Sequence, residues 1–189
     1  MLQNEIENET HSKMRFITFI ITMFARAYKM NKQQAFLYLE KYGGLDYLFK
    51  HWWTLHTEDL YWSLKALYSV CYINGGLKYY LNKKISKEQF LKELTHKTPT
   101  HQICFCTLRS LQALELHKEK NDVETIHIDN EIVQSLIAEQ GLTEMEAVKI
   151  YYTSNTYAQL SDDTSGLYQK TWFEIYEMLK KEIKSILDS

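Results

Sequence analysis

The chain has 189 residues and a formal net charge of -2, with 45% hydrophobic and 24% charged residues. This balance excludes a disordered chain and provides enough apolar surface for a buried core. A single proline, six glycines and 14 tyrosines favour helices packed with aromatic rings over a turn-rich β protein. Three cysteines without a C-x-x-C pair are typical of a reducing compartment, so we expect a cytoplasmic protein.

The amino-terminal region combines a polar lead-in, residues 1–12, with a helix expected from about Lys13 to Lys29. Its centre, Phe16 to Phe24, is an apolar run that superficially resembles the core of a signal peptide. The preceding residues are acidic, however, and the run is much shorter than the ~20 residues that span a bilayer. We therefore predict a buried core helix and no membrane-spanning segment.

Two further helices are expected before residue 77. Asn31 followed by Gln34 forms a capping box, which predicts a helix that ends at the glycine pair 43–44. Thr57, with two acidic residues after it, predicts the start of another helix that ends at the glycine pair 75–76.

An aromatic stretch, residues 45–57, lies between these helices, and we expect a single helical turn and a loop there. Two adjacent indoles, Trp52 and Trp53, are difficult to bury together in one small core, so at least one should be partly exposed. Exposed tryptophan is typical of binding surfaces. The stretch predicts that Tyr47, Trp52 and Trp53 contact a protein partner. The alternative is that both indoles seal the end of the helical hairpin.

The middle of the chain changes from a strand pattern to a helix pattern almost without a spacer. Polar and apolar side chains alternate over residues 102–107, which predicts a short strand that runs directly into a Leu-rich helix. Histidines and cysteines also gather here, at His96, His101, Cys104, Cys106 and His117. A tetrahedral zinc site is geometrically feasible, but C-x-C is a weak spacing and packing of the cysteines in a core is favoured, so we predict no metal site.

The carboxy-terminal part repeats the helical pattern. Helices are expected from Asp129 to Gln140, from the capping box of Thr143 and Glu146, and from Thr171. A shift of 112 residues overlays the two helical hairpins of the chain, and either a true duplication or convergence of two amphipathic hairpins explains this. The shift pairs Phe24 with Leu136, Asn31 with Thr143, Ala35 with Ala147, and Leu48 with Leu160.

Charge is distributed unevenly. Residues 122–189 carry a net charge of -8, because they hold 13 acidic and five basic residues, so residues 1–121 carry +6. A lysine-rich stretch, residues 78–97, has the composition of a nucleic-acid patch. The low sequence pI of about 6.4 favours instead a solvated helix face that docks on the acidic half. A DNA-binding regulator is therefore only a third hypothesis for the function.

Three segments resemble uncharacterised bacterial protein types. Residues 77–118, with the run Q-I-C-F-C-T-L-R-S-L-Q-A-L, resemble the carboxy-terminal end of an ADP-ribosyltransferase-like family. In that family the glutamine of the strand faces the nicotinamide nucleotide cleft, which implies this role for Gln102. The family's amino-terminal nucleotide-cradling segments have no counterpart upstream. Residues 13–76 and 123–188 resemble two small helical domain types often encoded beside this family, which implies a partner relationship.

Together these features predict a mainly α fold in which two small helical modules, residues 13–76 and 122–189, flank a strand-helix segment, residues 77–121. We expect the chain to act as a non-enzymatic protein-interaction module that is antitoxin-like or immunity-like toward an ADP-ribosyltransferase-like partner. A second copy of the chain is the next candidate for the partner. The module would use no cofactor. The alternative is a divergent or degenerate ADP-ribosyltransferase, and only that alternative uses NAD, with Gln102 in the cleft.

Overall fold

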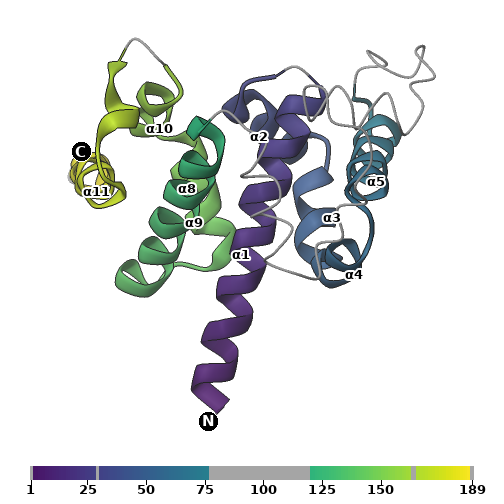
Figure 1. The fold of residues 1–189 in the computed structure, drawn as a ribbon, viewed down its shortest axis with the longest axis horizontal. Helices are drawn as coiled ribbons and strands as arrows, with labels where there is room; N and C mark the ends of the chain where they lie inside the picture. The colour runs from purple at the N-terminus through teal and green to yellow at the C-terminus, as the bar shows by residue number, and fades with distance from the viewer. Residues whose placement is uncertain (1, 29, 77–119, 163–164, 188–189) are drawn as a thin grey trace. The chain divides into compact units, whose positions relative to one another are not determined.

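Helices form the regular structure of the part of the chain that this computed structural model describes, residues 2–28, 30–76, 120–162 and 165–187 (Figure 1). No strand occurs within those ranges, and the expected mainly α fold is confirmed. The strand predicted at residues 102–107, and the helix after it, lie outside the described residues.

The chain divides into two compact units. Unit 1 comprises residues 1–18 and 124–189, and unit 2 comprises residues 19–123. The first helix, α1 (Leu2–Ala27), therefore contributes its first part to unit 1 and its last part to unit 2. The predicted boundary between the lead-in and the first module, at residues 12 and 13, falls inside this helix.

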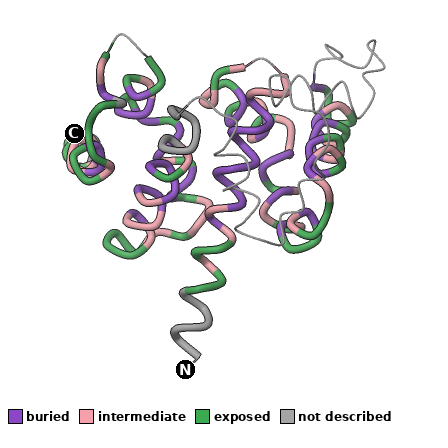
Figure 2. The backbone as a smooth tube through the Cα atoms, viewed as in Figure 1, coloured by how far each residue is buried: buried purple, intermediate pink, exposed green. Residues whose placement is uncertain are grey.

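Helix α1 begins earlier than expected, at Leu2 rather than at about Lys13. The polar residues before Lys13 include several good helix formers and neither glycine nor proline, so nothing stops the helix from extending toward the start of the chain. The apolar run from Phe16 to Phe24 is buried, which confirms the predicted core helix (Figure 2). In the described ranges, no helix is both long enough and apolar enough to cross a membrane.

Four helices follow in unit 2: α2 (Lys32–Lys41), α3 (Gly44–Lys50), α4 (Trp52–Thr57) and α5 (Leu60–Ile73). The predicted capping box of α2 is confirmed. The Gln34 amide donates to Asn31 Oδ1 at 2.7 Å, and the Asn31 amide donates to Gln34 Oε1 at 3.1 Å. The predicted core face of α2 is also confirmed, since its buried residues are Ala35, Phe36 and Leu39.

Helix α5 begins at Leu60, so the prediction of a start at Thr57 was wrong. The Thr57 hydroxyl donates to the Thr54 carbonyl at 2.9 Å and belongs to the end of α4. Asp59 caps α5 instead, because its carboxylate accepts a hydrogen bond from the Tyr61 amide at 2.9 Å.

Close packing of α3 requires glycine at its first position. A Cβ added to Gly44 would lie 2.6 Å from Cys71 Sγ of α5 and 2.7 Å from Leu39 Cδ2 of α2. Gly44→Ala is therefore expected to lower the free energy of unfolding by about 1–3 kcal/mol, as overpacking of a core does. Urea denaturation followed by circular dichroism measures this loss. Lys50→Ala, an exposed change on the same helix, is the control, and equal stabilities for the two variants would contradict the close packing.

Unit 1 contains most of α8 (Lys120–Gln140), followed by α9 (Glu144–Thr153), α10 (Asn155–Leu160), the short 3-10 helix η2 (Leu167–Gln169) and α11 (Trp172–Leu187). Helix α8 begins well before Asp129, so the predicted start at Asp129 was wrong. At the amino-terminal end of the chain, Lys13 of α1 forms an ion pair with Glu144 at the start of α9.

Capping boxes begin α9 and α11 as predicted. The Thr143 amide donates to Glu146 Oε2 at 2.9 Å, and the Thr171 hydroxyl donates to Glu174 Oε2 at 2.8 Å. Hydrogen bonds from the threonines lower the pKa of both glutamates below its ordinary value. Each of the two helix starts is thus specified by a pair of residues that lie within one helical turn.

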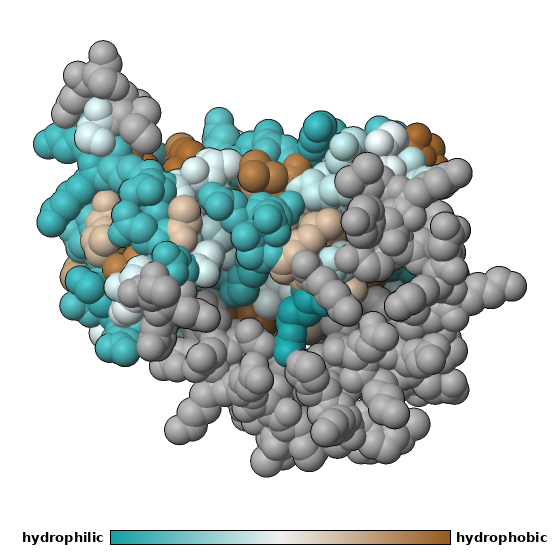
Figure 3. Space-filling model, turned by 90° about the horizontal axis from the view of Figure 1, so that it is seen from above, coloured by the Kyte–Doolittle hydropathy of each residue, from teal (hydrophilic) through white to brown (hydrophobic). Residues whose placement is uncertain are grey.

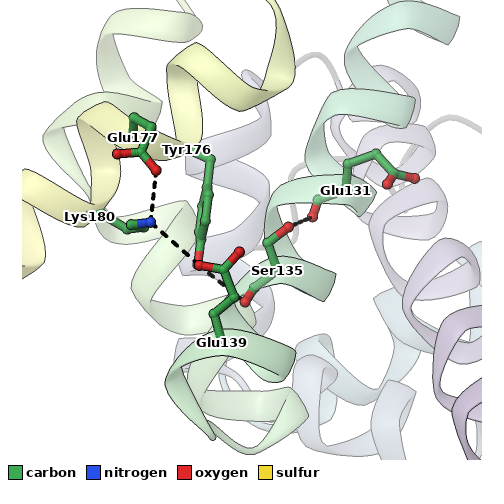
Figure 4. Close-up of polar contacts among 6 residues, drawn as sticks. All are labelled: Glu131, Ser135, Glu139, Tyr176, Glu177 and Lys180. Carbon is green, nitrogen blue, oxygen red and sulfur yellow. Dashed lines mark hydrogen bonds and ion pairs between the residues drawn. The ribbon is translucent and has the colours of Figure 1, made fainter.

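Polar side chains join α8 to α11 (Figure 4). The Tyr176 hydroxyl lies 3.2 Å from the Ser135 carbonyl oxygen and 3.1 Å from Glu139 Oε2. Lys180 Nζ lies between two carboxylates, 3.4 Å from Glu139 and 2.7 Å from Glu177. These contacts fix the register of the two helices beside their buried apolar faces.

The helices of unit 2 recur in unit 1 at the predicted shift of 112 residues. The shift takes the first residue of α2 to that of α9 and the first residue of α5 to that of α11, and α10 begins within one residue of the position equivalent to the start of α3. We call residues 19–73 repeat 1 and residues 131–185 repeat 2. The overlay of two hairpins therefore extends through four helices. Equivalent buried positions include Ile20 and Ile132, Phe24 and Leu136, Ala35 and Ala147, Leu64 and Tyr176, and Leu67 and Leu179.

Candidate interaction surface

The aromatic stretch folds into two short helices rather than a single turn and a loop. Helix α3 ends at Lys50 and α4 begins at Trp52, with His51 between them at φ -113° and ψ 17°. The apolar residues at positions 45, 48, 52 and 55 follow helical spacing, a signal that the aromatic residues around them obscure. The Ser63 hydroxyl then ties α4 to α5 by donating to the Leu55 carbonyl at 2.9 Å.

The two adjacent tryptophans point in different directions. Neighbouring residues on a helix lie about 100° apart around its axis, so one indole can enter the core while the other leaves it. Trp52 is 9% exposed and Trp53 is 63% exposed. The rings meet edge to face with centroids 5.3 Å apart. The prediction that at least one of them is partly exposed is confirmed.

Other rings support the exposed indole. The His56 ring stacks on Trp53 with centroids 5.8 Å apart and also lies 6.1 Å from the Trp52 ring. Burial lowers the pKa of His56, so its imidazole is neutral at pH 7. On α3, Tyr47 contacts His51 at a centroid distance of 4.5 Å. The structure thus places Tyr47, Trp52 and Trp53 on two consecutive helices, with only Trp53 strongly exposed.

Large exposed hydrophobic side chains are unevenly distributed over the described residues. Unit 2 has four of them, Leu37, Trp53, Trp62 and Ile73, whereas unit 1 has only Phe173. Figure 3 shows hydrophobic residues on one face of the molecule as small islands among hydrophilic ones. Isolated apolar side chains of this kind are common on protein surfaces, so among them Trp53 is distinguished by its size and by the rings that it contacts.

Candidate catalytic and metal-binding residues lie elsewhere in the chain. Gln102 and the histidines and cysteines of residues 96–117 fall outside the described ranges. Within those ranges, no group of three or more His, Cys, Asp or Glu side chains could hold a metal ion. The aromatic surface itself provides stacking and apolar contacts.

Unit 1 contains a buried acid that the sequence did not predict. Asp129 is fully buried in the middle of α8. The Tyr151 hydroxyl donates to its Oδ1 at 2.8 Å, and the Tyr152 hydroxyl donates to its Oδ2 at 3.5 Å. Tyr157 packs against both rings, with centroids 4.8 Å from Tyr151 and 4.7 Å from Tyr152. The only signal in the sequence was an acid inside the apolar pattern I-H-I-D-N-E-I-V.

This tyrosine cluster, Tyr151, Tyr152 and Tyr157, is held in its neutral form. Burial, together with the nearby Asp129 carboxylate, raises the pKa of all three phenols well above its ordinary value. A buried carboxylate needs hydrogen-bond donors, and the phenols supply them. The cluster therefore fastens α8 to α9 and leaves no reactive tyrosinate at neutral pH.

A family model matches part of the chain. The model of a family described as "Protein of unknown function (DUF3791)" matches residues 15–59, a stretch that includes the aromatic helices α3 and α4. No curated protein matches the chain. No solved structure matches it either.

Proposed function

We propose that this chain is a non-enzymatic protein-interaction module that binds a protein partner through the surface around Trp53. The observation that carries the proposal is the 63% exposure of an indole whose neighbour, Trp52, is held in the core. Burying such a side chain against a partner contributes about 2 kcal/mol or more of binding free energy at the centre of an interface.

The setting of Trp53 suits an interface. Its backbone belongs to a helix, and its ring contacts both Trp52 and His56, so little side-chain freedom is left to lose on binding. The neutral imidazole of His56 adds no charge that would have to be desolvated. These features favour an uncharged, apolar contact on the partner protein.

An ADP-ribosyltransferase-like protein is the first candidate for the partner. This choice rests on the resemblance of the three segments of the chain to that family and to the small domain types encoded beside it. In such a pair the chain acts as an antitoxin-like or immunity-like factor and needs no cofactor of its own.

Isothermal titration of the chain with an ADP-ribosyltransferase-like protein encoded beside it tests the proposal. Trp53→Ala is expected to weaken binding about 30-fold, which corresponds to about 2 kcal/mol. Leu37→Ala is the control, because Leu37 is also an exposed apolar residue of unit 2 but lies on α2. The wild-type chain should also lower the rate of nicotinamide release by the partner.

Two results would contradict the proposal. The first is equal affinity of the wild-type and Trp53→Ala chains. The second is nicotinamide release from NAD by the purified chain alone, which would favour the transferase alternative.

A further inference from the structure

The two repeats provide an internal comparison of what the fold requires. Along α5, Trp62, Lys65, Ser69 and Ile73 are spaced three or four residues apart and are all exposed, so they form one outward face, which we call the α5 stripe. Its large apolar members are Trp62, 50% exposed, and Ile73, 80% exposed. The equivalent residues of α11 are Glu174, Glu177, Lys181 and Ser185.

The fold does not need an apolar α5 stripe. Along α11, repeat 2 buries the equivalents of Ser63, Leu64 and Leu67 while it carries glutamate in place of Trp62 and serine in place of Ile73. The stripe also carries a fixed positive charge, because Lys65 Nζ lies 4.9 Å above the Trp62 ring and 5.8 Å from the Tyr61 ring. An apolar face with a lysine at its centre fits a partner that is apolar and acidic.

Such a face exists on the other repeat of the same chain. Phe173 is 55% exposed at the start of α11, beside Glu174 and Glu177. The two helices also differ in charge at equivalent positions, since the α5 stripe holds Lys65 and no acidic residue, whereas the first two turns of α11 hold Glu174 and Glu177. Every copy of the chain therefore carries both an apolar face with one lysine, on α5, and an aromatic side chain beside two carboxylates, on α11.

We propose that two copies of this chain associate, with the α5 stripe of one copy on the first three turns of α11 of the other. Lys65 and Glu177 occupy equivalent positions of equivalent helices, and they carry opposite charges. An antiparallel crossing of α5 and α11 that is centred on Lys65 and Glu177 places these two side chains opposite each other, and residues after Lys65 then face residues before Glu177. Lys65 of one copy then meets Glu177 of the other, which also pairs with Lys180 of its own copy. Phe173 lies opposite the turn of α5 between Lys65 and Ile73, and Trp62 lies over the turn of α11 that follows Glu177.

A second copy explains these residues better than a nucleic acid does. The α5 stripe contains only one basic residue between two large apolar ones, whereas a surface that binds phosphates needs several basic groups. A protein surface with a carboxylate beside an aromatic ring satisfies both the lysine and the apolar residues. Binding of a labelled single-stranded or duplex DNA that is lost in Lys65→Glu would support the nucleic acid and overturn the dimer.

Sedimentation velocity of the full chain over a range of concentrations tests the proposal. We expect a dimer that forms as concentration rises and that weakens as salt is added. Lys65→Glu and Glu177→Lys should each raise the dissociation constant about tenfold or more, because each places like charges in contact. The double variant K65E/E177K should recover most of the lost affinity. Ile73→Ser, which installs the residue found in repeat 2, should also weaken the dimer.

Matched variants separate this contact from other effects. Lys50→Glu makes the same charge change on α3, away from the α5 stripe, and should leave the dimer intact. Lys65→Glu should leave binding of the partner at Trp53 unchanged, so the failure of either proposal can be recognised independently. A chain that stays monomeric at all concentrations would overturn the dimer. So would a double variant that is no better than the two single variants.

Discussion

Replacing Trp52 by Ala is expected to lower the free energy of unfolding by about 3–5 kcal/mol, the usual effect of deleting a large buried aromatic side chain. Trp53→Ala should change it by less than about 0.5 kcal/mol, as for other exposed positions. The two residues are adjacent on the six-residue helix α4, so the change in helix propensity is nearly the same for both. The difference between them therefore reports burial, 9% exposed against 63%.

Chemical denaturation followed by circular dichroism gives both free energies in the same protein. Trp52→Phe is a useful intermediate, because it keeps a ring in the core and should recover part of the loss. If Trp53→Ala were as destabilising as Trp52→Ala, both indoles would belong to the core. The alternative from the sequence, in which both rings seal the helical hairpin, would then replace the interaction surface.

Helix starts that depend on neighbouring residues could be predicted from the sequence. The capping boxes at Asn31, Thr143 and Thr171 each join a capping residue to a side chain three residues later. The residues that specify each helix start are therefore close together in the sequence. The same locality made the shift of 112 residues visible, because caps and core positions recur together. These local signals were enough to predict a mainly α fold.

Features that depend on tertiary contacts could not be predicted. Aspartate is a residue type that often begins a helix, so Asp129 was expected at a helix start. Only the hydroxyls of Tyr151 and Tyr152, on another helix, explain why it is buried inside α8. Similarly, Thr57 is a better cap than Asp59 by its neighbours alone, yet the end of α4 uses its hydroxyl. In both cases a side chain that favours a helix start found a different partner in the fold.

The sequence predicted which residues form the candidate surface but not which of their side chains face outward. Adjacent tryptophans indicate that one ring is exposed, because few small cores accommodate two neighbouring indoles. Which ring faces outward depends on the interruption at His51, which sets where α4 begins and which residues of α4 face the core. The α5 stripe was not predicted at all, because it becomes visible only when α5 and α11 are recognised as equivalent helices.

Raising the pH above about 10, where an exposed tyrosine loses its proton, is expected to destabilise the fold strongly. Burial raises the pKa of Tyr151, Tyr152 and Tyr157 well above that value in the folded chain, and the Asp129 carboxylate raises it further. Above pH 10 the unfolded chain therefore binds fewer protons than the folded chain, so the free energy of unfolding falls as pH rises. Below pH 10 the stabilisation is fully present.

Each such tyrosine should contribute a slope of about 1.4 kcal/mol per pH unit between its unfolded and folded pKa values. In unit 2, burial raises the pKa of Tyr28 in the same direction and that of Tyr38 to about 12, so the loss should involve both units. Denaturation midpoints at a series of alkaline pH values measure the total slope. Tyr157→Phe removes one titrating phenol and should make the slope of the free energy of unfolding against pH shallower. Formation of the full tyrosinate absorbance near pH 10 in the folded protein would contradict the prediction, because it would show that the tyrosine cluster is open to water.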